Sequence, residues 1–201
     1  EKNGLIYVFT TLKLDGKRQV GIVTFNTERD QKITFKSHVI DGDLLFSYPT
    51  VSGLDILTLH KKKSILELLS IVENNLSTKV IIVEDKEAKS ILNKYSFNYI
   101  DSTTTNFAFL SSENKAFKDN GKLILLVNKD EAPFTVTELK KIDLDFDTGK
   151  LNFSKFKLPL APRTNHSSYL YKDCIYTLGL NSDYFSLSIN DKNSFKALAN
   201  L

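Results

Sequence analysis

The feature that most constrains this chain is a succession of short segments rich in β-branched and aromatic residues, each ended by a turn signal. Residues 5–14 (LIYVFTTLKL) and 19–25 (QVGIVTF) have this composition. Asp15 and Gly16 stand between them, and such a pair is typical of a tight hairpin turn. The sequence therefore predicts that the chain starts with a β-hairpin.

Alternating side chains extend this pattern through the first third of the chain. Residues 32–40 (KITFKSHVI) place one set of side chains inward and the other outward. The two sets are Ile33, Phe35, Ser37 and Val39, against Lys32, Thr34, Lys36 and His38. Residues 43–48 and 54–59 follow as further strands, so we expect an antiparallel meander.

The last third of the chain returns to the same pattern of short strands and turns. A turn at Asp147, Thr148 and Gly149 separates two alternating segments. The expected strands cover residues 123–128, 135–146, 151–158, 169–171, 174–180 and 184–189.

The middle of the chain fits either a helix or further strands. Apolar residues at helical spacing, with Ser64 as an N-cap and Glu67 three residues later, predict a helix near 64–76. A second such pattern predicts a helix near 86–95, after a strand at 79–83. Short strands can imitate this spacing, so an all-β meander and an α+β fold both stay open.

Similar segments recur along the chain at a rough interval. They begin near Leu5, Asp43, Lys79, Lys122 and Cys174, at intervals of 38, 36, 43 and 52 residues. Propeller blades have periods of roughly 40 to 50 residues. This recurrence of similar segments favours a stack of antiparallel meander blades.

Residues 142–189 resemble a kelch-type β-propeller repeat. The matching features are a strand that ends in Asp147-Thr148-Gly149, Leu158-Pro159 ahead of Arg163, His166-Ser167 at the start of the next strand, and Ile175-Tyr176. The chain has Leu178-Gly179 where this family has two adjacent glycines, and it contains no Trp.

The resemblance implies a single all-β, propeller-like domain over residues 1–201. At roughly 40 residues a blade, the 201 residues give about five blades, as a small closed ring or as part of a larger one. The chain begins with Glu1 and contains no Met, which favours a part of a larger ring. One small sheet cannot bury both faces alone, so neighbouring blades must stack.

Charge and hydropathy narrow the classes of function. The net charge is +3, from lysines scattered among Asp and Glu, which does not predict nucleic-acid binding. The longest apolar runs are about five residues, far below the roughly 18 to 20 that cross a bilayer. One cysteine, Cys174, cannot form an internal disulfide, so secreted and cytoplasmic locations both stay open.

No catalytic or metal motif stands out, so we expect neither a cofactor nor a metal. Asp143, Asp145 and Asp147 resemble the start of a calcium loop, but Gly149 comes one position late. Alternation on a strand, with the three aspartates facing water, explains them better.

Arg163, Asn165 and His166 are the candidate binding residues. They follow Pro162 in a predicted loop, and in kelch-like propellers such loops line the face where partners bind. We therefore expect a non-catalytic binding or scaffolding module that recognises a protein or a glycan. The alternative is a propeller enzyme that acts on carbohydrate with a site assembled from distant acidic residues.

Overall fold

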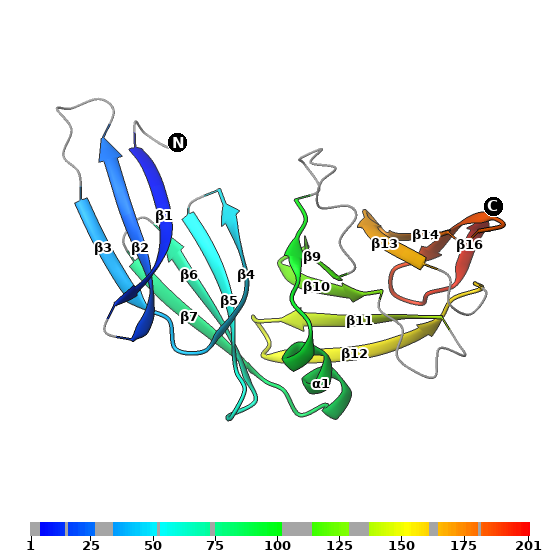
Figure 1. Cartoon of the computed structure of the whole chain (residues 1–201), viewed down its shortest axis with the longest axis horizontal. Helices are drawn as coiled ribbons and strands as arrows, with labels where there is room; N and C mark the ends of the chain where they lie inside the picture. Colours follow the sequence, from blue (N-terminus) through cyan, green and yellow to red (C-terminus); the bar gives the residue numbers. More distant parts are fainter. Residues whose placement is uncertain are drawn as a thin grey trace. The chain divides into compact units, whose positions relative to one another are not determined.

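The computed structural model describes residues 5–14, 16–26, 34–51, 53–72, 75–101, 114–128, 137–160, 165–180 and 182–201. These residues form four sheets and one helix (Figure 1). The chain divides into two compact units, Glu1–Ile82 and Val83–Leu201.

Unit 1 contains two antiparallel meander sheets in which consecutive strands are neighbours. The first consists of β1 (Leu5–Leu14), β2 (Lys17–Asn26) and β3 (Thr34–Val39). The second consists of β4 (Asp43–Thr50), β5 (Gly53–His60), β6 (Ile65–Val72) and β7 (Asn75–Ile82). The predicted first hairpin is confirmed, because Leu14 pairs with Lys17 around Gly16.

The two sheets of unit 1 share one hydrophobic core. Val20 and Ile22 of β2 pack with Ile56 of β5 and with Leu69 and Ile71 of β6. Each of these side chains is at most 6% exposed. Burial of the face that carries Val20 and Ile22 leaves the opposite face of the β1–β3 sheet outward.

Unit 2 also contains two sheets. The first has the order β12-β11-β10-β9-β8, and among the described strands its β8–β9 pair alone is parallel. Its strands are β8 (Asn98–Tyr99), β9 (Asn114–Asp119), β10 (Lys122–Val127), β11 (Glu138–Asp145) and β12 (Lys150–Lys157). The second is a four-stranded antiparallel meander of β13 (Asn165–Tyr171), β14 (Cys174–Leu180), β15 (Phe185–Asp191) and β16 (Ala197–Asn200).

The sheets of unit 2 also meet in one core. Ile124 and Leu126 of β10 belong to the same buried cluster as Leu170 of β13 and Ile175 of β14. Aromatic rings extend the contact: Phe117 meets Tyr169 edge to face at 5.3 Å, and Phe156 stacks on Phe195 at 3.9 Å. Ring pairs of this kind add to the energy of burial alone.

The helix α1 (Lys86–Lys94) confirms the helical prediction near 86–95. The side chain of Asp85 accepts a hydrogen bond from the backbone N–H of Ala88 at 2.8 Å, which caps the N-terminus. Ile91 and Leu92 are buried on one side of the helix. Glu87 forms an ion pair with Lys155, so α1 lies beside β12.

Of the two interpretations left open for residues 64–76, the helix is wrong and the strand is confirmed, because residues 65–72 form β6 and residues 75–76 begin β7. Leu66 and Leu68 are buried on one face of β6, and Leu69 and Ile71 on the other. A strand buried on both faces has a nearly continuous apolar run, and this run imitated a helical period. Ser64 has φ 56°, a turn conformation rather than an N-cap.

The all-β fold class is therefore confirmed, with meander sheets that have the form of propeller blades. The described residues form four sheets rather than about five, because the segment near Lys79 lies in β7, the last strand of a preceding sheet. The single propeller-like domain over residues 1–201 stays a prediction.

Gly53 provides a test of how closely β5 approaches β6. A Cβ atom at this position would lie 1.8 Å from the carbonyl oxygen of Ile71. Gly53→Ala should therefore lower the free energy of unfolding by at least ~2 kcal/mol, as measured by chemical denaturation. Gly121→Asn is the control, because no atom lies within 4 Å of that Cβ and Asn tolerates the positive φ of 81°. Equal stability of the two variants would contradict this close approach.

Candidate binding surfaces

The predicted binding residues lie at the start of β13 and in the segment before it. Arg163 lies outside the described residues, so its position is not assigned. Asn165 is the first residue of β13 and His166 the second, so their side chains point to opposite faces of the sheet. The strand therefore does not bring these two side chains together.

His166 lies on the inner side of its sheet. It is paired with Gly179, which in turn is paired with Ser186. A Cβ at Gly179 would lie 2.7 Å from the side chain of Leu160, so Leu160 covers this side. His166 is accordingly half-buried.

Asn165 lies on the opposite, outer side, at an end of the sheet where apolar residues are exposed; further along β13 on this side, Ser167 and Tyr169 contact Lys115 and Phe117 of β9. It pairs with Leu180, and Leu180 pairs with Phe185. Leu178 follows on the same face. We call Leu178, Leu180 and Phe185 the outer-face patch; they are 40%, 50% and 71% exposed. Contiguous exposed apolar residues mark interaction sites more often than isolated ones do.

Buried lysines connect the two sheets of unit 2. Local sequence patterns did not predict their burial. Lys115 of β9 is fully buried, and its Nζ donates a hydrogen bond to Ser167 Oγ of β13 at 2.7 Å. Burial lowers the pKa of Lys115 to about 8, because the charged ammonium loses solvation.

A second connection between the sheets centres on Lys192. Its ammonium lies 2.8 Å from Asp119 Oδ2 and 2.9 Å from Asp173 Oδ1. The hydrogen bond that Lys192 donates to Asp119 is the main cause that raises the pKa of Lys192, and Asp173 adds to it. Lys141 Nζ donates to the backbone carbonyl of Lys192 at 3.0 Å and pairs with Asp143 at 2.9 Å. These charges are partnered within unit 2, which is typical of a structural network.

The aspartates that resemble a calcium loop have structural roles. Asp145 Oδ1 accepts hydrogen bonds from the backbone N–H groups of Asp147 and Thr148, both at 3.1 Å. The Thr148 N–H is the main cause that lowers the pKa of Asp145, and Lys122, 3.2 Å away, contributes further. Asp145 thus fixes the turn between β11 and β12.

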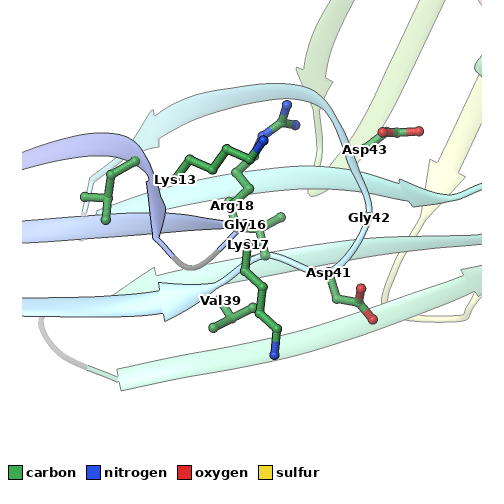
Figure 2. Close-up of a pocket in the computed structure, with 10 residues that line it drawn as sticks. Lys13, Gly16, Lys17, Arg18, Val39, Asp41, Gly42 and Asp43 are labelled. Atoms are coloured by element: carbon green, nitrogen blue, oxygen red, sulfur yellow. The ribbon is translucent and has the colours of Figure 1, made fainter.

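A hollow of 840 Å³ lies in unit 1, where the β1–β2 hairpin turn meets the connection from β3 to β4 (Figure 2). Charged and apolar side chains both line it. The lining consists of Leu12, Lys13, Gly16, Lys17, Arg18, Val39, Ile40, Asp41, Gly42 and Asp43.

The cations at this hollow come from one hairpin. Lys13 and Arg18 are direct cross-strand neighbours, and such a like-charge pair is destabilising. The two nearby aspartates have other partners. Asp43 pairs with Lys61 at 3.0 Å, and Asp41 lies 3.9 Å from His60 Nδ1.

Among the described residues, no group of three or more His, Cys, Asp and Glu side chains is arranged to hold a metal ion. Cys174 is half-buried and not in a disulfide. No described helix is long and apolar enough to span a membrane.

No family model and no curated protein matches this sequence. Among solved structures, the chain is similar to the β-propeller domain of Nup133 from Vanderwaltozyma polyspora, at 10% sequence identity and a TM-score of 0.38. The match covers 100% of this chain and 63% of that one. The chain thus spans less than two thirds of the length of that structure.

The lowered pKa of Lys115 predicts a pH-dependent stability. Between pH 8 and 10.5 the unfolded chain binds a proton that the folded chain has lost, so this group makes stability rise with pH. Lys115→Met removes that contribution. Lys115→Met should change the free energy of unfolding more favourably at pH 7 than at pH 10, and the two changes should differ by ~2 kcal/mol. Urea titrations of both proteins at both pH values measure this difference.

The matched control is Lys118→Met, an exposed lysine on the same strand. Its effect on stability should not differ between the two pH values. A pH-independent effect of Lys115→Met would show that Lys115 keeps an ordinary pKa.

The two carboxylates that hold Lys192 should contribute unequally. The side chain of Asp119 is 23% exposed, whereas that of Asp173 is 82% exposed and screened by solvent. Asp119→Asn should lower the free energy of unfolding by about 1 to 3 kcal/mol, and Asp173→Asn by less than about 1 kcal/mol. Thermal unfolding of the two variants side by side measures this difference, and equal losses would contradict it.

Proposed function

We propose that this protein is a non-catalytic binding or scaffolding module that recognises a partner protein through the outer face of the β13–β16 sheet. The observation that carries this proposal is the outer-face patch of Leu178, Leu180 and Phe185. Exposed apolar side chains at neighbouring positions of a sheet cost free energy in water, and a protein partner that covers them recovers it.

Asn165 would supply the polar part of this interface. Its position beside Leu180 and Phe185 places an amide, with both donor and acceptor groups, at the margin of an apolar surface. Interfaces commonly combine an apolar centre with a polar rim. Arg163 stays a proposed member of this site. His166 stays a proposed binding residue, but it points to the opposite face of the sheet from the outer-face patch. The relation to kelch repeats also stays a proposal.

A glycan partner is the second candidate in the same class. The leucines of the patch favour a protein, because sugars need many hydrogen-bonding groups around an aromatic ring. The carbohydrate-processing enzyme stays a prediction from the sequence, and the described residues supply no specific observation in its favour.

Site-specific photocrosslinking tests the proposed surface. The full chain, with a photoreactive phenylalanine analogue at position 185, is added to an extract of the cells that produce the protein. We expect one discrete protein adduct. The same analogue at Asn193, an exposed turn residue of the same sheet, should give none.

Two leucine variants make the test sharper. Leu180→Ser should reduce the adduct at position 185 by at least about tenfold, the effect of losing ~1.4 kcal/mol of binding. Leu198→Ser is the control, because Leu198 is exposed to 57% on β16 and lies outside the patch. Equal adducts from positions 185 and 193, or equal effects of the two variants, would overturn the proposal.

A further inference from the structure

The strand β7 lies at the edge of its sheet with its side chains exposed. No described strand pairs with the side of β7 that faces away from β6. Seven of its eight residues are exposed, and Ile81 is the buried one. An edge of this kind carries unpaired N–H and C=O groups, which form a template for pairing with another strand.

The apolar residues of β7 lie on the core side of the β4–β7 sheet. Leu76 is directly opposite Ile71 of β6, and Val80 and Ile82 follow on the same face. Ile71 belongs to the core that the two sheets of unit 1 share. Leu76, Val80 and Ile82 are nevertheless 41%, 52% and 62% exposed. The apolar face of the core therefore continues onto β7, where its side chains are left in contact with water.

The exposed apolar residues of the first sheet have a different position. Phe35 and Val39 of β3 are 55% and 52% exposed, but by register they lie on the face opposite to that of Val20 and Ile22. The alternation that the sequence predicts in β3 is therefore present, with its apolar side chains outward. Covering these two residues would start a new interface, whereas covering those of β7 extends the core already present.

The strand β7 lacks the features that commonly protect a sheet edge. Natural edge strands are often short, charged, interrupted by proline or distorted by a bulge. At the other edge of the same sheet, β4 contains Pro49 and a register shift between Leu44 and Phe46. In contrast, β7 has no proline, and its eight residues pair with β6 without a shift. Its one charged residue, Lys79, lies on the other face of the strand from the exposed apolar residues.

The sequence of β7 is complementary to itself in an antiparallel arrangement. When Thr78 of one copy lies opposite Thr78 of a second, Leu76 of each copy lies opposite Val80 of the other, on the core side. Lys79 then lies opposite Ser77, so no like charges meet. Moving the centre of the pairing by one residue toward the end of the strand would place Lys79 opposite Lys79, which is destabilising. Apolar cross-strand pairs and a threonine pair are both favourable.

We propose that β7 pairs with β7 of a second copy of this chain, antiparallel and centred on Thr78. A two-fold axis perpendicular to the sheet then joins two four-stranded sheets into one sheet of eight strands. The Leu76 and Val80 side chains of both copies become buried beside the two cores. A second copy brings a strand that is already formed, whereas an unstructured segment of another protein would lose conformational entropy on binding.

Analytical ultracentrifugation of the intact chain tests for this dimer. We expect a monomer–dimer equilibrium with a Kd below about 100 µM. Thr78→Lys places two like charges opposite each other at the axis, and should raise this Kd at least about tenfold. Thr10→Lys is the matched control, because Thr10 is also an exposed threonine on an edge strand of unit 1, and the Kd of this variant should be unchanged. A monomer at about 100 µM, or equal effects of the two variants, would overturn the proposal.

Disulfide crosslinking tests the register. In chains that also carry Cys174→Ser, an introduced cysteine is the only thiol. Thr78→Cys should form a reducible dimer, because directly opposite residues of an antiparallel pair are close enough for a disulfide. Val80→Cys is the control, because in this register its two copies are displaced by about 13 Å along the strands and should not crosslink. A dimer of Val80→Cys without one of Thr78→Cys would overturn the proposed register.

Two other results would place the contact elsewhere. Self-association that Leu180→Ser abolishes and Thr78→Lys leaves intact would place it on the outer-face patch, and would overturn this proposal. Self-association that Thr10→Lys abolishes would place it on β1, and would overturn it as well. The proposed function concerns a partner of unit 2 and does not depend on dimerisation, so each proposal can fail without the other.

Discussion

A small antiparallel sheet has two faces, and the structure of this chain depends on which of them another element covers. In the second and third sheets along the chain, the central strands are buried on both faces. In β5, the consecutive residues Ile56 and Leu57 are at most 1% exposed, and in β10 the consecutive residues Ile124 and Leu125 are at most 4% exposed. In the first and last sheets of the chain one face packs inward, and at least part of the other face carries exposed apolar side chains.

This difference explains what the sequence could predict. Hairpins were predictable wherever a turn signal separated two alternating segments, as at Gly16 and Gly149. The helix α1 was predictable because its apolar residues fall on one side and Asp85 can cap it. For residues 65–72 the sequence could not decide between a strand and a helix, because burial on both faces removes the alternation that distinguishes a strand.

One local signal could have placed a further hairpin. Asn120 and Gly121, at φ 47° and 81°, form the turn between β9 and β10, and Asn-Gly is the strongest short hairpin signal. No local sequence signal indicated the buried lysines. Lysine is mostly exposed in proteins, and only the meeting of β9 with β13 places Lys115 beside Ser167. Contacts between distant strands of this kind are not encoded in local periodicity.

The candidate surfaces follow from the same distinction between covered and uncovered faces. The sequence placed a binding site at residues 163–166 by resemblance, and the structure puts Asn165 on an exposed face and His166 on a covered one. It could not indicate that Phe35 and Val39 face outward, because alternation separates two faces without identifying the buried one. Val20 and Ile22 determine which face is buried, because their contacts with β5 and β6 fix the inner face of the sheet. Once they are buried, the opposite residues must face outward, so the exposure of Phe35 and Val39 is a consequence of the core.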